Sequence, residues 1–427
     1  MSKIESLDNP ALSKEMVGNK GYNLSCMRNI PSIKNYIPEG FVLTTEVFEE
    51  YGQRGQLPEE EISQAYYNLG LPPPAVSVRS SAAVSMPGMM QTVLDITDLP
   101  NLYAAIRYVL DSWYSPNAKA YRKLHDISDS LGTAVVVQRM VYGDLGKMSG
   151  TGVVFTRNPN TGDRELYGEF LRRARGEAIV SGTVTPHPIG ELRLTDPAKY
   201  SELKVVCRVL EKHFKDMQDV EFTIEQSRLY ILQTRAGKRT ALARARIALD
   251  LFRENILTKK QAKKMGLENG VADLKQYRLP SKGKVYKSIS LFGIGNPVSG
   301  GVVRGEAVLT AERAAYLSST GRHPILIRTT TSPDDLEGMF ASDGLVTAVG
   351  GTTSHAAVVA RSLNKPCICG MSFHFYTLKD YIQKGDLLIR GGDQITLDAN
   401  TGRLYLGYAS RLIKTGVPQE VQLLKNL

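Results

Sequence analysis

One histidine stands where a helix is predicted to begin. Residues 344–361, GLVTAVGGTTSHAAVVAR, pass from an apolar strand through two glycines and polar residues into an Ala-rich helix. At the start of that helix, around His355, free backbone N–H groups and the helix dipole favour an anion. A neutral imidazole is a nucleophile near pH 7, so His355 could accept a phosphoryl group. The alternative is an ordinary histidine in a first helical turn.

Four polar side chains fall on a predicted hairpin at 219–235, where two β-rich runs flank a polar turn. Because side chains alternate along strands, a turn centred on Ser227 would place Asp219, Glu221, Gln233 and Arg235 on one face. Paired carboxylates suit the Mg²⁺ that accompanies ATP, and a guanidinium neutralises phosphate charge. A surface charge ladder is the alternative reading.

Two further cations are candidate phosphate ligands. Arg79 follows a short strand at 76–78, and Pro87-Gly88 forms a turn whose backbone can approach a polyphosphate. Lys20, flanked by glycines in GNKGYN, could reach a phosphate, although alone it reads as a loop lysine. The chain has no G-x-x-x-x-G-K-[ST] and no G-x-G-x-x-G, which disfavours a P-loop or a Rossmann nucleotide site.

The strands and helices predicted to position these residues indicate an α/β (α+β) protein. At 427 residues the chain exceeds the usual ~100–200 residues per domain, so we expect at least two domains. Trp113 is expected in the core. The predicted elements are strands at 76–78 and 134–141, a helical stretch at 102–124, a helix at 241–254, and short strands within 290–407.

The positive charge is concentrated in one segment. Of a net charge of +10, residues 235–287 contribute +11, from 15 Lys and Arg against 4 Asp and Glu. We interpret this segment as a solvated connector. We disfavour nucleic acid as a partner, because the only aromatic residues beyond the helix at 241–254 are Tyr277 and Tyr286, with no recognised module.

Composition also limits the setting. No stretch approaches the ~18–20 apolar residues that span a bilayer, and the start lacks the apolar core of a signal peptide, so we expect no membrane and a cytoplasmic location. The four cysteines are too few and scattered for a disulfide framework. We expect Cys367 and Cys369 to be buried thiols, with metal binding as the alternative.

Five ordered motifs together resemble pyruvate, phosphate dikinase. They are SVRSSAAVSMPGMMQT at 77–92, SGTGVVFTRNPNTG at 149–162, LYGEF at 166–170, DMQDVEFT…LQTRAGKRT at 216–240 and TSHAAVVAR at 353–361. The resemblance covers most of 16–410 and weakens at 50–75, 100–132 and 255–290. Thr352 stands where the family often has Met.

The resemblance implies an ATP-grasp nucleotide-binding domain followed by a smaller, swivelling phosphohistidine domain. The expected divisions are an ATP-grasp domain at 1–240, a basic helical linker at 241–289, a phosphohistidine domain at 290–411 and a C-terminal tail at 412–427. In the family, ATP phosphorylates the histidine, giving AMP, and the phosphohistidine carries the group to a distant acceptor site.

The resemblance also implies roles for individual residues, with ATP and Mg²⁺ as cofactors. His355 would carry the phosphoryl group, with Arg79 and Arg235 as catalytic partners. Phosphates would contact Lys20, Arg79, Gly88, Met89, Thr92, Gln233 and Arg235. Asp219 and Glu221 would hold metal. Gln138, Met140 and Val141 would border adenine, and Glu169 would contact the ribose.

The acceptor is the main open alternative. The family's acceptor barrel needs roughly 250 residues, whereas 20 follow Gly407. We therefore expect an acceptor protein or domain in trans, with a small molecule held between the two domains as an alternative. The co-substrate could be inorganic phosphate, which the sequence motifs MPGMM and DMQDVEFT favour, or water, as in phosphoenolpyruvate synthase. A different reading is a catalytically silent ATP-binding regulatory or interaction protein.

Overall fold

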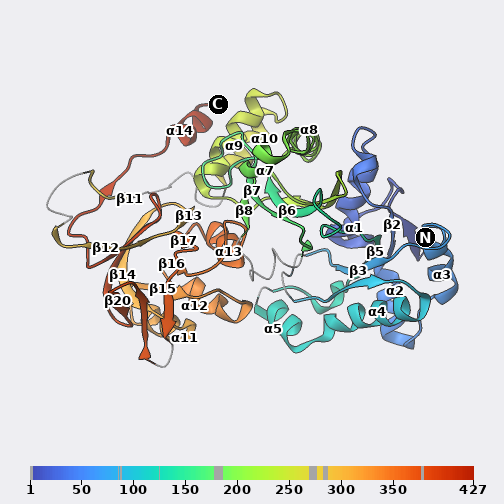
Figure 1. The fold of residues 1–427 in the computed structure, drawn as a ribbon, viewed down its shortest axis with the longest axis horizontal. Coiled ribbons are helices and arrows are strands. Elements are labelled where there is room, and N and C mark those ends of the chain that lie inside the picture. Colours follow the sequence, from blue (N-terminus) through green and yellow to red (C-terminus); the bar gives the residue numbers. More distant parts are fainter. Residues whose placement is uncertain are drawn as a thin grey trace. The chain divides into compact units, whose positions relative to one another are not determined.

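The chain folds into two compact units (Figure 1). The first unit is Met1–Thr151 with Val220–Arg235, and the second unit is Gly152–Asp219 with Ala236–Leu427. The computed structural model describes residues 3–84, 86, 89–124, 126–176, 186–268, 277–281, 287–376 and 379–427.

An antiparallel sheet forms the centre of the first unit, with strand order β1-β2-β5-β3-β4. Its middle strand β5 pairs antiparallel with β2 and β3, and the side chains of 134–137 are fully buried. The predicted strands at 76–78 and 134–141 are confirmed as β3 and β5. The strands are β1 (Ile4–Ser6), β2 (Gly40–Leu43), β3 (Val76–Ser81), β4 (Thr92–Ile96) and β5 (Ala134–Arg139).

Helices complete the core of the first unit. In α4 the apolar residues recur at helical spacing and face the sheet, and the following 3₁₀ turn at Ser112–Tyr114 buries Trp113 to 1% exposure. The predicted helical stretch at 102–124 is thus two helices joined by that turn, with Trp113 in the core as expected. The helices are α1 (Lys14–Arg28), α2 (Thr45–Arg54), α3 (Glu59–Tyr67), α4 (Leu99–Asp111) and α5 (Pro116–Leu124).

The predicted hairpin is confirmed as β9 and β10. The turn residues Gln226 and Ser227 both have positive φ, 45° and 70°, as a two-residue type I′ turn requires. The hairpin belongs to a sheet of order β10-β9-β6-β7-β8. Its strands are β6 (Gly150–Phe155), β7 (Tyr167–Arg172), β8 (His187–Pro188), β9 (Gln218–Glu225) and β10 (Arg228–Ala236).

Helices of the second unit pack around an apolar cluster that includes Ile247, Leu251, Ala262, Val421 and Leu424. The segment expected as a basic linker therefore contains two helices packed against the C-terminal one, while the predicted domain boundaries stay a prediction. The helices are α7 (Gly190–Thr195), α8 (Pro197–Phe214), α9 (Ala241–Arg253), α10 (Lys259–Leu267) and α14 (Gln419–Asn426). Two short strands, β11 (Tyr277–Arg278) and β23 (Ile413–Lys414), pair antiparallel with each other.

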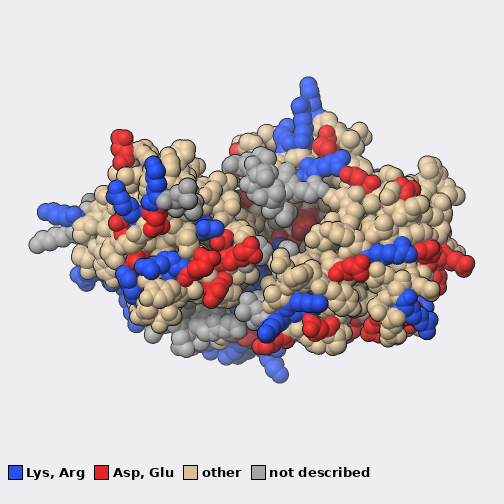
Figure 2. All heavy atoms as spheres, turned by 90° about the horizontal axis from the view of Figure 1, so that it is seen from below, with Lys and Arg blue, Asp and Glu red and all other residues tan. Residues whose placement is uncertain are grey.

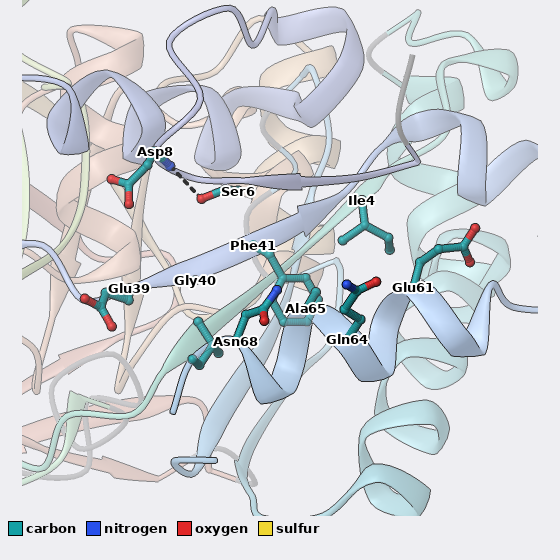
Figure 3. A pocket seen from close by; sticks show the side chains of 11 residues that line it. Ile4, Ser6, Asp8, Glu39, Gly40, Phe41, Glu61, Gln64, Ala65 and Asn68 are labelled. Atoms are coloured by element: carbon teal, nitrogen blue, oxygen red, sulfur yellow. Dashed lines mark hydrogen bonds between the residues drawn. The ribbon is translucent and has the colours of Figure 1, made fainter. Parts of the chain in front are cut away.

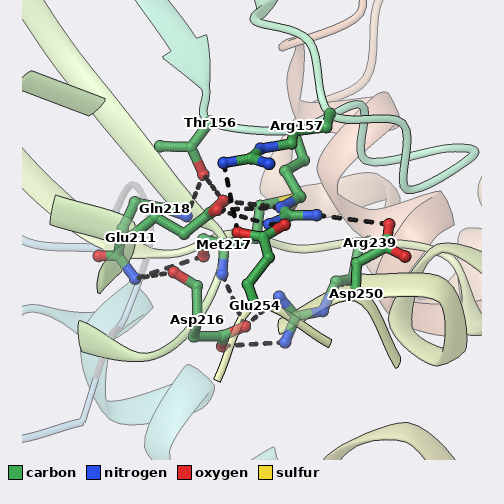
Figure 4. Close-up of polar contacts among 10 residues, drawn as sticks. Thr156, Arg157, Glu211, Asp216, Met217, Gln218, Arg239, Asp250 and Glu254 are labelled. Carbon is green, nitrogen blue, oxygen red and sulfur yellow. Dashed lines mark hydrogen bonds and ion pairs between the residues drawn. The ribbon is translucent and has the colours of Figure 1, made fainter. Parts of the chain in front are cut away.

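A buried ion network ties α8 and α9 to the loop after β6 (Figure 4). The guanidinium of Arg157 is fully buried, and its Nη2 donates to Glu211 Oε1 at 2.8 Å and to Glu254 Oε1 at 2.9 Å. Thr156 Oγ1 also donates to Glu211, at 2.8 Å. Because a buried charge is costly unless it is paired, these contacts are a condition for this part of the second unit to fold.

The remaining part of the second unit, strands β12–β22 with helices α11–α13, is called the histidine module. Its eight-stranded sheet has the order β12-β22-β21-β14-β15-β16-β17-β13, and the run β14 to β17 is parallel. The elements are β12 (Ser290–Ile294), β13 (Asn296–Ser299), β14 (Val302–Val308), α11 (Ala311–Ser319), β15 (Pro324–Arg328), α12 (Leu336–Ala341), β16 (Gly344–Thr347), α13 (His355–Leu363), β17 (Cys367–Cys369), β18 (His374–Tyr376), β19 (Tyr381–Lys384), β20 (Leu387–Arg390), β21 (Gln394–Asp398) and β22 (Arg403–Leu406).

Surface charge of both signs is interspersed over the face in Figure 2. Within the basic segment 235–287, Arg239 pairs with Asp216 at 2.5 Å and Arg246 with Asp163 at 2.7 Å. These carboxylates neutralise part of the positive charge of the segment. No helix among the described residues has both the length and the apolar character to cross a membrane.

Candidate functional site

A sharp local turn places Lys20 against the end of β3. Gly18 has φ 65° within α1, and a Cβ there would lie 1.8 Å from the carbonyl oxygen of Ser81. Only glycine permits this approach. The Gly21 N–H donates to Ser81 Oγ at 3.0 Å, and Lys20 Nζ donates to the Ser80 carbonyl at 2.9 Å. The glycines of GNKG thus hold the lysine beside β3.

Arg79 extends from β3 into the same region. Its Nη2 donates to Gln138 Oε1 and, at 3.4 Å, to the Leu232 carbonyl of β10. Gln138 is itself fixed by a 3.0 Å bond to the carbonyl of Pro38. Arg79 Nε is buried without a hydrogen-bond partner among the described residues. The guanidinium is therefore held in position with one donor still available.

The charges of Lys20, Arg79, Arg235 and Glu221 influence one another in the first unit. Burial lowers the pKa of Lys20 to about 8; Arg79 lowers it further, Glu221 opposes the shift, and Arg235 has the smallest effect, again lowering it. Burial likewise lowers the pKa of Arg79, and the negative charge of Glu221 opposes this shift. Three cations facing one carboxylate leave an excess of positive charge, so the residues present fit a polyphosphate anion.

The hairpin residues are distributed over both units. Glu221, Gln233 and Arg235 lie in the first unit, and Asp219 is the last residue of a segment of the second. Two carboxylates on one strand fit Mg²⁺, which usually takes one or two protein carboxylates and completes its shell with phosphates and water. In the part of the chain that the structure describes, no three His, Cys, Asp or Glu side chains gather as metal ligands. Metal binding by Asp219 and Glu221 stays a prediction.

The other predicted nucleotide contacts have mixed environments. Thr92 is exposed and lies opposite Arg79 in the β3–β4 register. The Met89 side chain is buried in the apolar core, and its backbone N–H donates to the Met86 carbonyl at 3.2 Å, so its phosphate contact stays a prediction. Met140 and Val141 follow β5 and are half-buried. Gly88 lies outside the described residues.

His355 is the first residue of α13 and is half-buried. Ser354 caps the helix, its Oγ accepting the N–H of Ala357 at 3.4 Å. The Nδ1 atom of His355 lies 3.0 Å from Thr331 Oγ1. Burial lowers the pKa of His355, and the charge of Asp335 opposes this only partly. The imidazole is therefore neutral near pH 7, as a nucleophile requires.

Strand topology explains why Thr331 meets His355. Strands β15 and β16 are parallel neighbours, with Arg328 opposite Thr347. The loops that leave their carboxyl ends therefore emerge at the same edge of the sheet. Sequence reasoning missed Thr331, 24 residues before the histidine, although reading the apolar run at 324–328 as a strand parallel to the one before Gly350 would have indicated it.

Glu169, predicted as a ribose contact, binds the loop in front of His355. Its Oε1 accepts the backbone N–H of Thr352 at 2.5 Å and the Thr352 hydroxyl at 3.1 Å, while Oε2 accepts the Thr353 hydroxyl. A Cβ on Gly351 would lie 1.9 Å from Glu169 Oε1, so the glycine permits this contact. Strand β7 and the start of α13 therefore lie side by side (Figure 1). The ribose role itself stays a prediction.

Strand β17 packs against α13. Cys367 and Cys369 are both free and fully buried, with their sulfur atoms 3.8 Å apart, which confirms the expectation of buried thiols. The hydrogen bond between the two thiols raises the pKa of Cys367 and lowers that of Cys369 to about 7. They pack with Ala356, Ala357 and Ala360 of α13.

A cavity of about 470 Å³ lies elsewhere in the first unit, between β1, β2 and α3 (Figure 3). Its lining includes Asp8, Glu39, Glu61 and Gln64, and none of the predicted site residues. Acidic walls of this kind do not suit a phosphate. The cavity is therefore separate from the cluster around Lys20 and Arg79.

Comparison with known families supports both halves of the site. Residues 56–198 and 191–255 match the family described as pyruvate phosphate dikinase, AMP/ATP-binding domain. Residues 321–402 match the PEP-utilising enzyme, mobile domain, and this range includes His355. Among solved structures, that of Enzyme I (nEIt) covers 26% of this chain at 24% identity with a TM-score of 0.16, too little to carry an argument.

Curated relatives point the same way. Pyruvate, phosphate dikinase 2 of Zea mays is 36% identical over 92% of this chain and 56% of its own length, and pyruvate, phosphate dikinase of Rickettsia felis is 35% identical over 94% and 57%. The chain thus spans about half the length of the curated relatives it matches. With an ATP-grasp AMP/ATP-binding domain and the mobile histidine-bearing domain, the chain belongs to the pyruvate, phosphate dikinase family.

Proposed function

We propose that this protein is an ATP-dependent phosphotransferase that phosphorylates its own His355, converts ATP to AMP, and passes the phosphoryl group to an acceptor in trans. The observation that carries the proposal is the state of His355, a neutral imidazole at a helix start whose Nδ1 is engaged by Thr331. The family's ATP-binding and mobile domains support ATP as the donor.

Because Thr331 engages Nδ1, we assign the attack to Nε2, in the tautomer that carries its proton on Nδ1. With Nδ1–H donating to Thr331 Oγ1, the lone pair of the neutral ring lies on Nε2, which then attacks the phosphoryl group. Nε2 attacks the β-phosphorus of ATP, and the bond from that phosphorus to the AMP oxygen breaks as the Nε2–P bond forms. The terminal phosphate of the pyrophosphoryl group now on Nε2 then passes to inorganic phosphate, giving pyrophosphate and leaving one phosphoryl group on His355. The new charge lies at the N-terminal end of α13, where the helix dipole stabilises it.

Lys20, Arg79 and Arg235 would bind the polyphosphate and offset the charge that builds up during transfer. Their excess positive charge and the available Nε of Arg79 support this role. Asp219 and Glu221 would hold Mg²⁺, which spreads phosphate charge when bound. Gln138, Met140 and Val141 would border the adenine, with Thr92, Gln233 and the backbone at Gly88 and Met89 near the phosphates.

The acceptor is proposed from the extent of the matched domains. Neither match includes an acceptor-binding barrel. A second protein or domain that presents the acceptor to His355 is consistent with this, and inorganic phosphate is the proposed co-substrate that takes the remaining phosphate of ATP. A cytoplasmic location goes with this proposal.

The experiment is mass spectrometry of the intact protein after incubation with Mg²⁺ and ATP, with and without inorganic phosphate, and with the nucleotide products measured in parallel. We expect AMP in both cases, with one added phosphoryl group when inorganic phosphate is present and a two-phosphate adduct when it is absent, and neither AMP nor adduct in His355→Asn. ATP binding with no AMP and no adduct would instead favour a silent nucleotide-binding protein.

A further inference from the structure

The guanidinium of Arg361 is buried without compensation. Arg361 lies in the last turn of α13 and is 1% exposed. Its Nε donates to Asn160 Oδ1 at 2.9 Å, but Nη1 and Nη2 are buried with no hydrogen-bond partner among the described residues. Native proteins seldom bury a charge in this way, because the lost hydration is costly.

The groups around Arg361 do not neutralise its positive charge. The side chain lies over the Phe155 ring, 5.4 Å from the ring centroid. Burial lowers the pKa of Arg361, and the groups that oppose the shift do so only in part. These groups are, from largest to smallest effect, Tyr167, Cys369, Cys367 and Asp219. A net positive charge therefore remains at this position.

The burial depends on contact between two matched domains within the second unit. Arg361 belongs to the mobile-domain match, whereas Asn160, Phe155 and Tyr167 belong to the AMP/ATP-binding match. Asn160 Nδ2 also donates to Tyr167 Oη, within the AMP/ATP-binding match, and to the Pro297 carbonyl of the histidine module, both at 3.3 Å. If the histidine module separates from β7, the guanidinium regains water. We call the arrangement in which the histidine module contacts β7 the docked arrangement. Only this arrangement is destabilised by the unpaired charge.

We propose that Arg361 is a positioning residue that makes docking of the histidine module depend on the negative charge of a bound nucleoside triphosphate. Without nucleotide the unpaired guanidinium weakens the docked arrangement. A magnesium-bound triphosphate keeps a net negative charge, and at Asp219, which already acts on Arg361, it would stabilise the cation across a low-dielectric interior. This inference rests on the proposed function, since it needs that nucleotide site.

Hydrogen–deuterium exchange of residues 351–358 measures docking directly, because the Thr352 N–H donates to Glu169 in the docked arrangement. Arg361→Met keeps the length and removes the charge. Without nucleotide we expect its exchange there to be roughly tenfold slower than in the parent protein, as replacing an unpaired buried charge by an apolar group stabilises. Mg²⁺ with α,β-methylene-ATP should slow exchange in the parent and add nothing in Arg361→Met.

Two matched variants test the charge rather than the shape. Arg361→Lys keeps a cation and should keep the nucleotide response. Asn160→Ala removes the hydrogen-bond acceptor of Arg361 Nε and should speed exchange, the opposite of Arg361→Met. Exchange in α9 reports that each variant is folded.

Equal exchange of Arg361→Met and the parent without nucleotide, or an equal nucleotide response in the two, would overturn the inference. Failure of the proposed function has a different signature. In that case ATP leaves His355 unphosphorylated while Arg361→Met still protects residues 351–358 without nucleotide, which supports the role of the charge.

Discussion

The carboxylate of Glu169 accepts the backbone N–H of Thr352 at 2.5 Å, three residues before His355. A charged acceptor makes this a strong hydrogen bond. It fixes the loop from which α13 begins, and it joins the strand that carries LYGEF to the module that carries TSHAA. The relationship assigns to Glu169 a task that its predicted ribose contact did not include.

The two roles of Glu169 differ in what Glu169→Gln changes. If the carboxylate serves docking, phosphorylation of His355 should fall roughly five- to tenfold, as expected for a lost charge-assisted hydrogen bond, with nucleotide affinity unchanged. Gly351→Ala, whose Cβ would meet Glu169 Oε1, should act in the same direction. A drop in nucleotide affinity, measured by titration with α,β-methylene-ATP, would instead support the ribose contact.

Thr331 holds the His355 ring through its hydrogen bond to Nδ1, so Thr331→Val should slow phosphorylation by roughly tenfold without changing nucleotide affinity, consistent with one lost hydrogen bond. Thr331→Ser retains the hydroxyl and should recover most of the rate. Single-turnover kinetics with ATP measure both variants. Equal rates for Thr331→Val and the parent would contradict this role.

The pH dependence should have two limbs. The pKa of His355 is lowered by burial, so the neutral nucleophile persists down to below pH 6.5 and the rate falls only as the pH drops through that lowered pKa. Lys20 has a pKa of about 8 and loses its charge above that pH, which should weaken nucleotide binding there. Titration of affinity against pH tests this, with Lys20→Arg as the matched control. Arginine stays charged, so an unchanged alkaline limb in Lys20→Arg would rule out Lys20 as its origin.

The Arg157 network should dominate the stability of the helical part of the second unit. Glu211→Ala leaves a buried guanidinium without its main partner and should cost about 3–5 kcal/mol. Glu202→Ala on the same helix removes a partly exposed pair with Lys199 and should cost about 1 kcal/mol or less. Urea unfolding compares the two variants. Similar losses for both would show that the network contributes little.

The sequence predicted the parts of the site that depend on local pattern. The hairpin, the helix start at His355 and the cations Lys20 and Arg79 each follow from turn, capping or strand signals, and the structure brings Lys20, Arg79, Glu221 and Arg235 within electrostatic reach of one another. These signals act over a few residues, which is why a single sequence contains them.

The parts that were missed depend on tertiary contacts. Thr331 reaches His355 through the parallel pairing of β15 and β16, and Asn160 meets Arg361 from 201 residues away. The Met89 side chain packs in the core, and its predicted phosphate contact stays a prediction. No periodicity in the chain encodes such contacts.

The most direct measurement follows the label from ATP. Incubation with Mg²⁺ and ATP labelled at the β-phosphate should place label on the protein, stable in base and lost in acid, with AMP released in equal amount. His355→Asn should take up none. Label that persists in His355→Asn, or its absence from the parent protein both with and without inorganic phosphate, would contradict phosphotransfer through His355.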